Sequence, residues 1–129
     1  MERKDIVEKL DQLYSISIIP RTFPLMQGDI TDPNKSVYWN EEVVAYSQKV
    51  YREELKTLKK KKEEAIKEFT QKEIYPYIQK NLSSKYSDEG IAFLFSKALD
   101  TSYHYGAYEV MGAVDELIDF LNVMQKYQE

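Results

Sequence analysis

The chain contains no cysteine and only one histidine. Without cysteine it can form neither disulfides nor thiolate metal sites, and one imidazole is too few for a zinc site that needs two or more. Redox chemistry, zinc chemistry and catalysis by a cysteine nucleophile are therefore excluded at the level of composition. We expect no cofactor, no metal site and no catalytic residues.

Chain breakers are also scarce, with only four glycines and four prolines in 129 residues. Apolar residues make up 43% and charged residues 31%, which is a globular composition, not a disordered one. A chain of this length supports one core, so we expect a single domain over residues 1–129. No apolar run approaches the roughly 20 residues that span a bilayer, which predicts a cytoplasmic protein without a membrane partner.

The charge balance is mildly acidic, with a formal net charge of −4 at pH 7. This balance argues against general nucleic-acid binding, although the middle of the chain is faintly basic and residues 81–129 are acidic. The run from Lys59 to Lys62 is followed at once by Glu63 and Glu64, and successive lysines point in all directions around a helix. We therefore expect a solvated helix face there and no nucleic-acid partner.

Apolar residues recur at helical spacing over most of the chain, which predicts an all-α fold. The main helix is expected from about Glu41 to Ile74, capped by Asn40, before Pro76 kinks or restarts the chain. Another helix, capped by Ser87, is expected to bend near residues 102–106. The expected architecture is a helical bundle with one long central helix and a bent C-terminal helix. Two further sets of residues form apolar stripes: Ile6, Val7, Leu10, Leu13 and Tyr14 in an N-terminal helix, and Ala107, Val110, Met111, Val114, Leu117, Ile118, Leu121 and Met124 in the C-terminal helix.

The long central helix carries an apolar seam with alternating spacings of four and three residues. At about 1.5 Å per residue, this helix would be roughly 50 Å long, more than a compact bundle of this mass covers. We therefore expect part of it to meet another subunit in a homo-oligomer. The seam consists of Tyr51, Leu55, Leu58, Lys62, Ala65 and Phe69.

Residues 15–39 break the helical pattern with prolines and a glycine but remain rich in apolar side chains. We expect an irregular, packed loop in this N-terminal region. The alternation over Ser15–Ile18 leaves open a short two-stranded ribbon with Val37–Trp39. The single tryptophan, Trp39, is expected to be largely buried.

An acidic pair, Glu116 and Asp119, lies in the expected C-terminal helix. This pair resembles the E-x-x-D half of the all-α nucleoside triphosphate pyrophosphatases of the MazG type. The resemblance implies a magnesium-dependent enzyme in which an earlier E-E-x-x-E helix supplies more oxygen ligands. The best earlier match, Glu63–Glu68, has a different spacing and lies far upstream. A pyrophosphatase is therefore the third functional hypothesis.

Four side chains able to stack or hydrogen-bond fall along one flank of the C-terminal helix: His104, Tyr108, Asp115 and Asp119. Gly112 lies beside them, although a glycine inside a helix costs about 1 kcal/mol relative to alanine. Something is expected to approach closely there. Either the flank is a wet, acidic surface with the glycine at an intramolecular crossing, or it is a binding site.

The stretch Tyr105–Glu109, with its aromatic-Gly-x-Tyr-Glu pattern, precedes an acidic amphipathic helix. It resembles small helical accessory proteins of bacteriophages, and the resemblance covers roughly the last 30 residues. This implies a binding role, such as inhibition of a host or defence protein. We therefore expect a non-enzymatic protein that occupies a partner protein's surface. The alternative is sequestration of a nucleotide-like small molecule, which would need positive charge from elsewhere because residues 81–129 contain few lysines.

Overall fold

The computed structural model describes residues 1–26, 40–100 and 106–128 of the chain. Within these ranges every regular element is a helix and no strand occurs, which confirms the all-α fold. Contacts divide the chain into two units, one made of Met1–Ile16 with Glu64–Glu129 and the other of Ser17–Glu63. This division concerns contacts alone, so the expected single domain stays a prediction.

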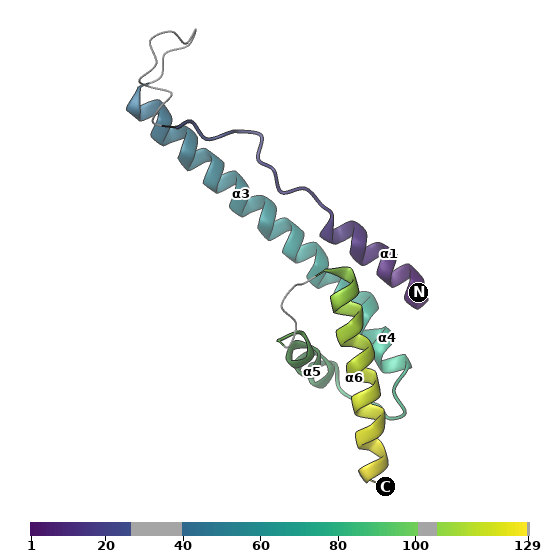
Figure 1. Cartoon of the computed structure of the whole chain (residues 1–129). Coiled ribbons are helices and arrows are strands. Elements are labelled where there is room, and N and C mark those ends of the chain that lie inside the picture. Colours follow the sequence, from purple (N-terminus) through teal and green to yellow (C-terminus); the bar gives the residue numbers. More distant parts are fainter. Residues whose placement is uncertain (27–39, 101–105, 129) are drawn as a thin grey trace. The chain divides into compact units, whose positions relative to one another are not determined.

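The first unit holds the main hydrophobic core, and α6 lies at its centre (Figure 1). Helix α6 contacts both α1 and α5, and α4 contacts α5. The elements of this unit are α1 (Arg3–Tyr14), the end of α3 (Glu41–Phe69), a π-helical turn η1 (Thr70–Ile74), α4 (Tyr75–Lys80), α5 (Asp88–Asp100) and α6 (Ala107–Gln128). Fully enclosed side chains come from all of these elements except α3: Ile6, Leu10, Ile74, Ile78, Ile91, Met111 and Val114.

Side-chain caps fix the starts of α3 and α5. The Asn40 Oδ1 atom accepts a 2.8 Å hydrogen bond from the Val43 amide, and the Ser87 Oγ atom accepts a 3.0 Å bond from the Gly90 amide. Both side chains satisfy amides that have no partner within the helix. The two caps predicted from the sequence are confirmed.

The helical path changes just before Pro76. Helix α3 ends at Phe69, and a π-helical turn then leads into α4, where Pro76 lies in the first turn. Proline has no amide hydrogen, and its ring collides with the carbonyl group four residues earlier in a regular α-helix. The wider turn accommodates the proline without ending the helical path, so the expected kink or restart takes the form of a π-helical turn.

The second unit consists of the first 23 residues of α3, Glu41–Glu63, and an extended segment, residues 17–26, that runs beside them (Figure 1). Polar groups hold this segment. The Thr22 amide and hydroxyl donate to the two carboxylate oxygens of Glu54 at 3.1 and 2.8 Å. Nearer the start of α3, the Leu25 amide donates to Ser47 Oγ at 3.0 Å, and Gln48 Nε2 donates to the Leu25 carbonyl at 2.9 Å.

Apolar burial contributes little to this second unit. Among its described residues only Val44 is buried, whereas Ile19, Phe23 and Met26 are 81%, 74% and 65% exposed. The loop was expected to pack through its apolar side chains, and for these three that expectation is wrong. Hydrogen bonds can fix an extended backbone beside a helix while its side chains remain in solvent.

Several expectations fall on residues outside the described ranges. Ser15–Ile18 is described and forms no strand. Its proposed partner, Val37–Trp39, lies outside these ranges, so the expected burial of Trp39 stays a prediction. Most of the bend expected near residues 102–106 lies there as well, although α5 and α6 are separate helices on either side of it. No helix within the described ranges is long and apolar enough to cross a bilayer.

Candidate functional site

Helix α6 presents its predicted flank to solvent because its opposite side is committed to the core. Val110 and Val114 are buried against α1 and α5, which turns Tyr108, Gly112 and Asp119 outward. The Tyr108 ring is 76% exposed. His104, the first predicted residue of this flank, lies outside the described residues. The structure therefore places three of the five predicted site residues together on the exposed side of α6.

The remaining predicted residue, Asp115, is engaged within the fold. Arg3 Nη2 lies 2.7 Å from Asp115 Oδ2, and Arg3 Nε lies 3.3 Å from Asp115 Oδ1. This two-point contact joins α1 to α6, and the hydrogen bond from the guanidinium group raises the pKa of Arg3. About half of each side chain remains exposed. Asp115 is therefore held by a contact within the fold and is not a free carboxylate on the flank.

Asn122 continues the same flank and is also engaged within the fold. Its Oδ1 atom accepts hydrogen bonds from the Ser83 amide and hydroxyl at 3.0 and 3.1 Å, and its Nδ2 atom donates to the Asn81 carbonyl at 3.1 Å. These bonds attach the α4–α5 connection to α6. The C-terminal part of the flank therefore holds the α4–α5 connection in place.

Gly112 has open space beside it. A Cβ atom built on this residue would meet no other atom within 4 Å, apart from its chain neighbours and its own helix. No described residue outside α6 therefore packs against Gly112, so an intramolecular crossing there finds no support among the described residues. The glycine leaves a section of α6 where another molecule can approach the backbone closely.

The C-terminal end of α6 carries an apolar surface that the sequence analysis did not identify. Phe120, Val123, Met124 and Tyr127 are 53%, 48%, 39% and 81% exposed, and they follow one another at helical spacing. We call these four residues the apolar end of α6. Met124 was expected in the buried stripe, and that expectation is wrong because the stripe is covered only as far as Leu121.

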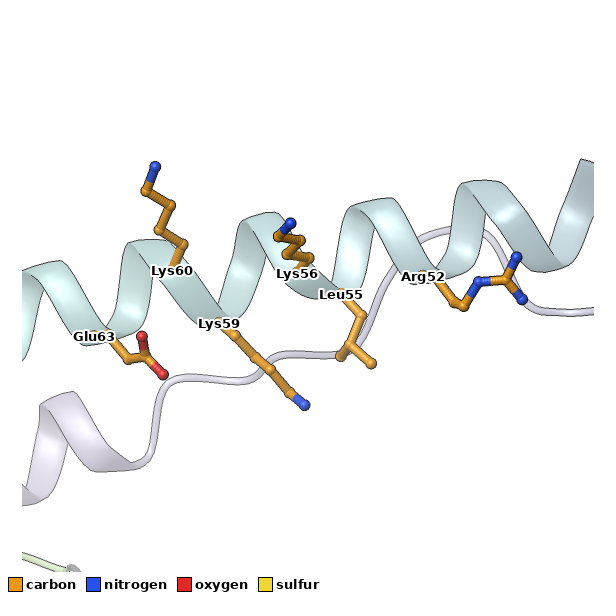
Figure 2. Close-up of a pocket in the computed structure, with 6 residues that line it drawn as sticks. All are labelled: Arg52, Leu55, Lys56, Lys59, Lys60 and Glu63. Carbon is orange, nitrogen blue, oxygen red and sulfur yellow. The ribbon is translucent and has the colours of Figure 1, made fainter.

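A second surface lies on α3, where four cations line a groove of about 470 Å³ (Figure 2). Arg52, Lys56, Lys59 and Lys60 project from successive turns beside the apolar side chain of Leu55. The groove also includes Glu63. The solvated helix face expected here thus gathers four cations and one carboxylate, and these five side chains are exposed. We call these six residues the basic groove.

The acidic pair on α6, Glu116 and Asp119, belongs to no metal-binding cluster among the described residues. The described residues contain no group of three or more histidine or acidic side chains arranged to hold a metal ion. Glu116 and Asp119 therefore lack, within those ranges, the second set of ligands that the pyrophosphatase resemblance implies. That hypothesis gains no support from the geometry.

No family model, curated protein or solved structure matches this chain. The resemblance to bacteriophage accessory proteins consequently stays a prediction from the last part of the sequence. Any functional assignment must instead be argued from the described surfaces. The strongest of these are the exposed side of α6 and the basic groove of α3.

Proposed function

We propose that this chain is a non-enzymatic helical binding protein that acts by occupying the surface of a partner protein, with α6 as the contact. The apolar end of α6 carries the proposal. Four neighbouring large apolar side chains exposed on one helix have an unfavourable contact with water, which a partner would remove. Aromatic residues and methionine are also enriched at protein interfaces, and the patch contains Phe120, Met124 and Tyr127.

The part of α6 before this patch adds features that suit recognition. Tyr108 supplies an exposed aromatic ring, and Gly112 allows a partner to approach the helix closely. The exposed carboxylates of Glu116 and Asp119 lie between Gly112 and the apolar end. A partner lying along α6 would thus meet polar groups over the first turns and apolar groups over the last ones. Such a mixture is typical of interfaces with a dry centre and a polar rim.

The resemblance to bacteriophage accessory proteins suggests that the partner is a host or defence protein. Sequestration of a nucleotide-like molecule on the same flank has less support. The Arg3 guanidinium is already occupied by Asp115, and a phosphate there would have to compete with that carboxylate. A protein partner on this flank need not displace Asp115 from Arg3. The assignment as a protein-binding module is therefore the leading proposal.

Native mass spectrometry of the protein purified from its natural host tests this proposal. Replacing Val123 with Asp and Tyr127 with Ser removes two of the four side chains of the apolar end and leaves the buried residues intact. We expect the wild-type chain to retain a stoichiometric protein partner and the double variant to lose it. Phe93→Ser, which removes an exposed aromatic ring from α5, should keep the partner. A complex that survives both sets of changes, or a wild-type chain that carries only a small molecule, would refute the assignment.

Assembly with further copies of this chain is a separate part of the proposal, motivated by the seam of α3. Tyr51, Leu55, Leu58 and Ala65 are only half-buried within one chain, so they retain apolar surface for a second copy. Light scattering at tens of micromolar should give more than the monomer mass. A compact monomer at that concentration would refute homo-oligomerisation without affecting the role of α6.

A further inference from the structure

Five of the cations of α3 lie in a row along one side of the helix. Lys49, Arg52, Lys56 and Lys59 follow one another at intervals of three or four residues, and Lys60 lies one turn after Lys56. All five side chains are exposed. At about 1.5 Å per residue, the row extends over roughly 16 Å of helix. We call these five residues the basic row; four of them line the basic groove in Figure 2.

None of the five cations of the basic row forms an ion pair within the described parts of the chain. Lys72 and Glu68, four residues apart, form an ion pair of 2.6 Å. Glu63 has the same spacing from Lys59 and lines the same groove, yet no ion pair joins them. The basic row therefore offers cations that are available to an external anion.

The shape of the groove indicates what kind of anion fits. It lies along one side of a helix, and Leu55 is the one apolar residue among its described lining residues. Sites for small ligands usually bury most of the ligand surface, which a shallow groove on one helix cannot do. A linear polyanion needs no enclosure, because successive charges along its length can each meet a cation. Phosphate groups suit the mixture of Arg52 and lysines, since a guanidinium binds phosphate through two hydrogen bonds.

An exposed aromatic side chain adjoins the row. Tyr46 lies one turn before Lys49 and its ring is 69% exposed. Surfaces that bind single strands without sequence preference combine a track of cations with aromatic rings on which bases stack. We propose that the basic row of α3, together with Tyr46, binds the sugar-phosphate backbone of a single-stranded nucleic acid. This site is independent of the partner surface proposed on α6.

The net charge of −4 does not oppose this inference. The expectation of no nucleic-acid partner rested on that average and on lysines scattered around the helix. The basic groove removes the second reason, and the first weakens because an average over the whole chain says little about the charge along α3, where the five cations of the basic row lie together. Local charge governs contacts with phosphates once solvent and salt screen distant groups, beyond about 10 Å at 0.1 M salt.

Fluorescence anisotropy of the full chain with labelled single strands tests the proposal. The probes are oligothymidylate and oligouridylate of about 16 nucleotides, which separate DNA from RNA. With four or five phosphate contacts, the logarithm of the affinity should fall with the logarithm of the salt concentration with a slope of about −3. The double variant Lys56→Gln/Lys59→Gln should bind more weakly, with a slope smaller by about 1.4. Tyr46→Ala should weaken binding without changing this slope.

A matched variant separates the site from overall charge. Lys4→Gln/Lys61→Gln removes the same two charges from exposed positions outside the row, and glutamine keeps the helix propensity of lysine. This variant should bind as the wild type does. Three results would each overturn the proposal: no binding of either strand at about 50 mM salt, equal losses in the two double variants, or tighter binding to a duplex or to polyglutamate than to the single strands.

Discussion

Arg3 and Asp115 lie 112 residues apart in the sequence and form a two-point ion pair, with Nη2 and Oδ2 separated by 2.7 Å. The pair joins the first turn of α1 to the middle of α6. The ion pair also gives a structural role to Asp115, which was predicted from the sequence as a candidate binding residue. The carboxylate orients one helix against another, whereas Tyr108, Gly112 and Asp119 remain exposed beside it.

The first prediction concerns this ion pair. Asp115→Asn should lower the free energy of unfolding by about 0.2–1 kcal/mol, because both side chains are about half exposed and solvent screens their attraction. Arg3→Gln should have a similar effect, and the double variant should cost less than the sum of the two. Urea unfolding measures all three values. If the two losses simply add, the contact contributes nothing to stability.

The second prediction concerns the loop that Asn122 holds. Asn122→Ala removes three hydrogen bonds to Asn81 and Ser83 and should lower the free energy of unfolding by about 1 kcal/mol. Gln125→Ala, one turn further along α6, is the control because the structure shows no such bonds for Gln125. Equal destabilisation by the two changes would contradict a specific role for Asn122.

The buried stripe of α6 was predictable because it depends on local spacing alone. Residues separated by three and four positions share a helix face, and Val110, Val114 and Leu117 are indeed buried. Periodicity does not reveal how far along a helix its neighbours extend. Met124 continues the spacing but remains 39% exposed, since the cover ends near Leu121. Met124 was therefore expected in the core, although it belongs to the apolar end of α6.

The basic groove could have been found with the same geometric rule. Lys59 to Lys62 are consecutive and do point in different directions, which is why no concentrated basic face was expected even with Lys56 and Lys67 nearby. Extending the rule back to Arg52 and Lys56 would have placed these residues beside Lys59 and Lys60. By contrast, the Arg3–Asp115 contact depends on how α1 packs on α6, which no local pattern in a single sequence specifies.

The third prediction uses the pH dependence of the Thr22–Glu54 contact. The Thr22 amide first, and the Thr22 hydroxyl second, donate hydrogen bonds to the Glu54 carboxylate and hold its pKa below the ordinary value of 4.5. A carboxyl group whose folded pKa is lowered stabilises the folded form above its unfolded pKa. This contribution is lost as the pH falls below 4.5 and through the folded pKa. Nuclear magnetic resonance should show the Thr22 amide titrating in that range.

Two variants test whether the titration of the Thr22 amide arises from Glu54. Glu54→Gln keeps one oxygen acceptor and loses the other, so the Thr22 amide should no longer titrate and trypsin should cleave after Arg21 more readily at neutral pH. Glu64→Gln removes a charge elsewhere on α3 and should preserve both properties. A Thr22 amide that titrates unchanged in the Glu54→Gln protein would show that another group holds the extended segment.

The last prediction concerns Gly112. Its backbone has no positive φ angle and its Cβ position is open, so alanine fits without strain. Gly112→Ala should therefore raise the free energy of unfolding by about 0.5–1 kcal/mol, because glycine loses more backbone freedom in a helix. Gly90→Ala should gain less, since its Cβ would lie 3.1 Å from the Ser87 hydroxyl that caps α5.

Leucine at the same position separates packing from binding. Gly112→Leu should remain as stable as the wild type, because its side chain enters solvent, while its bulk blocks a partner that approaches the α6 backbone. Thermal unfolding and native mass spectrometry with the natural partner measure the two effects on one sample. A Gly112→Leu protein that unfolds well below the wild type would show that something within the fold packs there, with a cost of about 1–3 kcal/mol from overpacking. A stable protein that keeps its partner would remove the region around Gly112 from the proposed contact and confine it to the apolar end of α6.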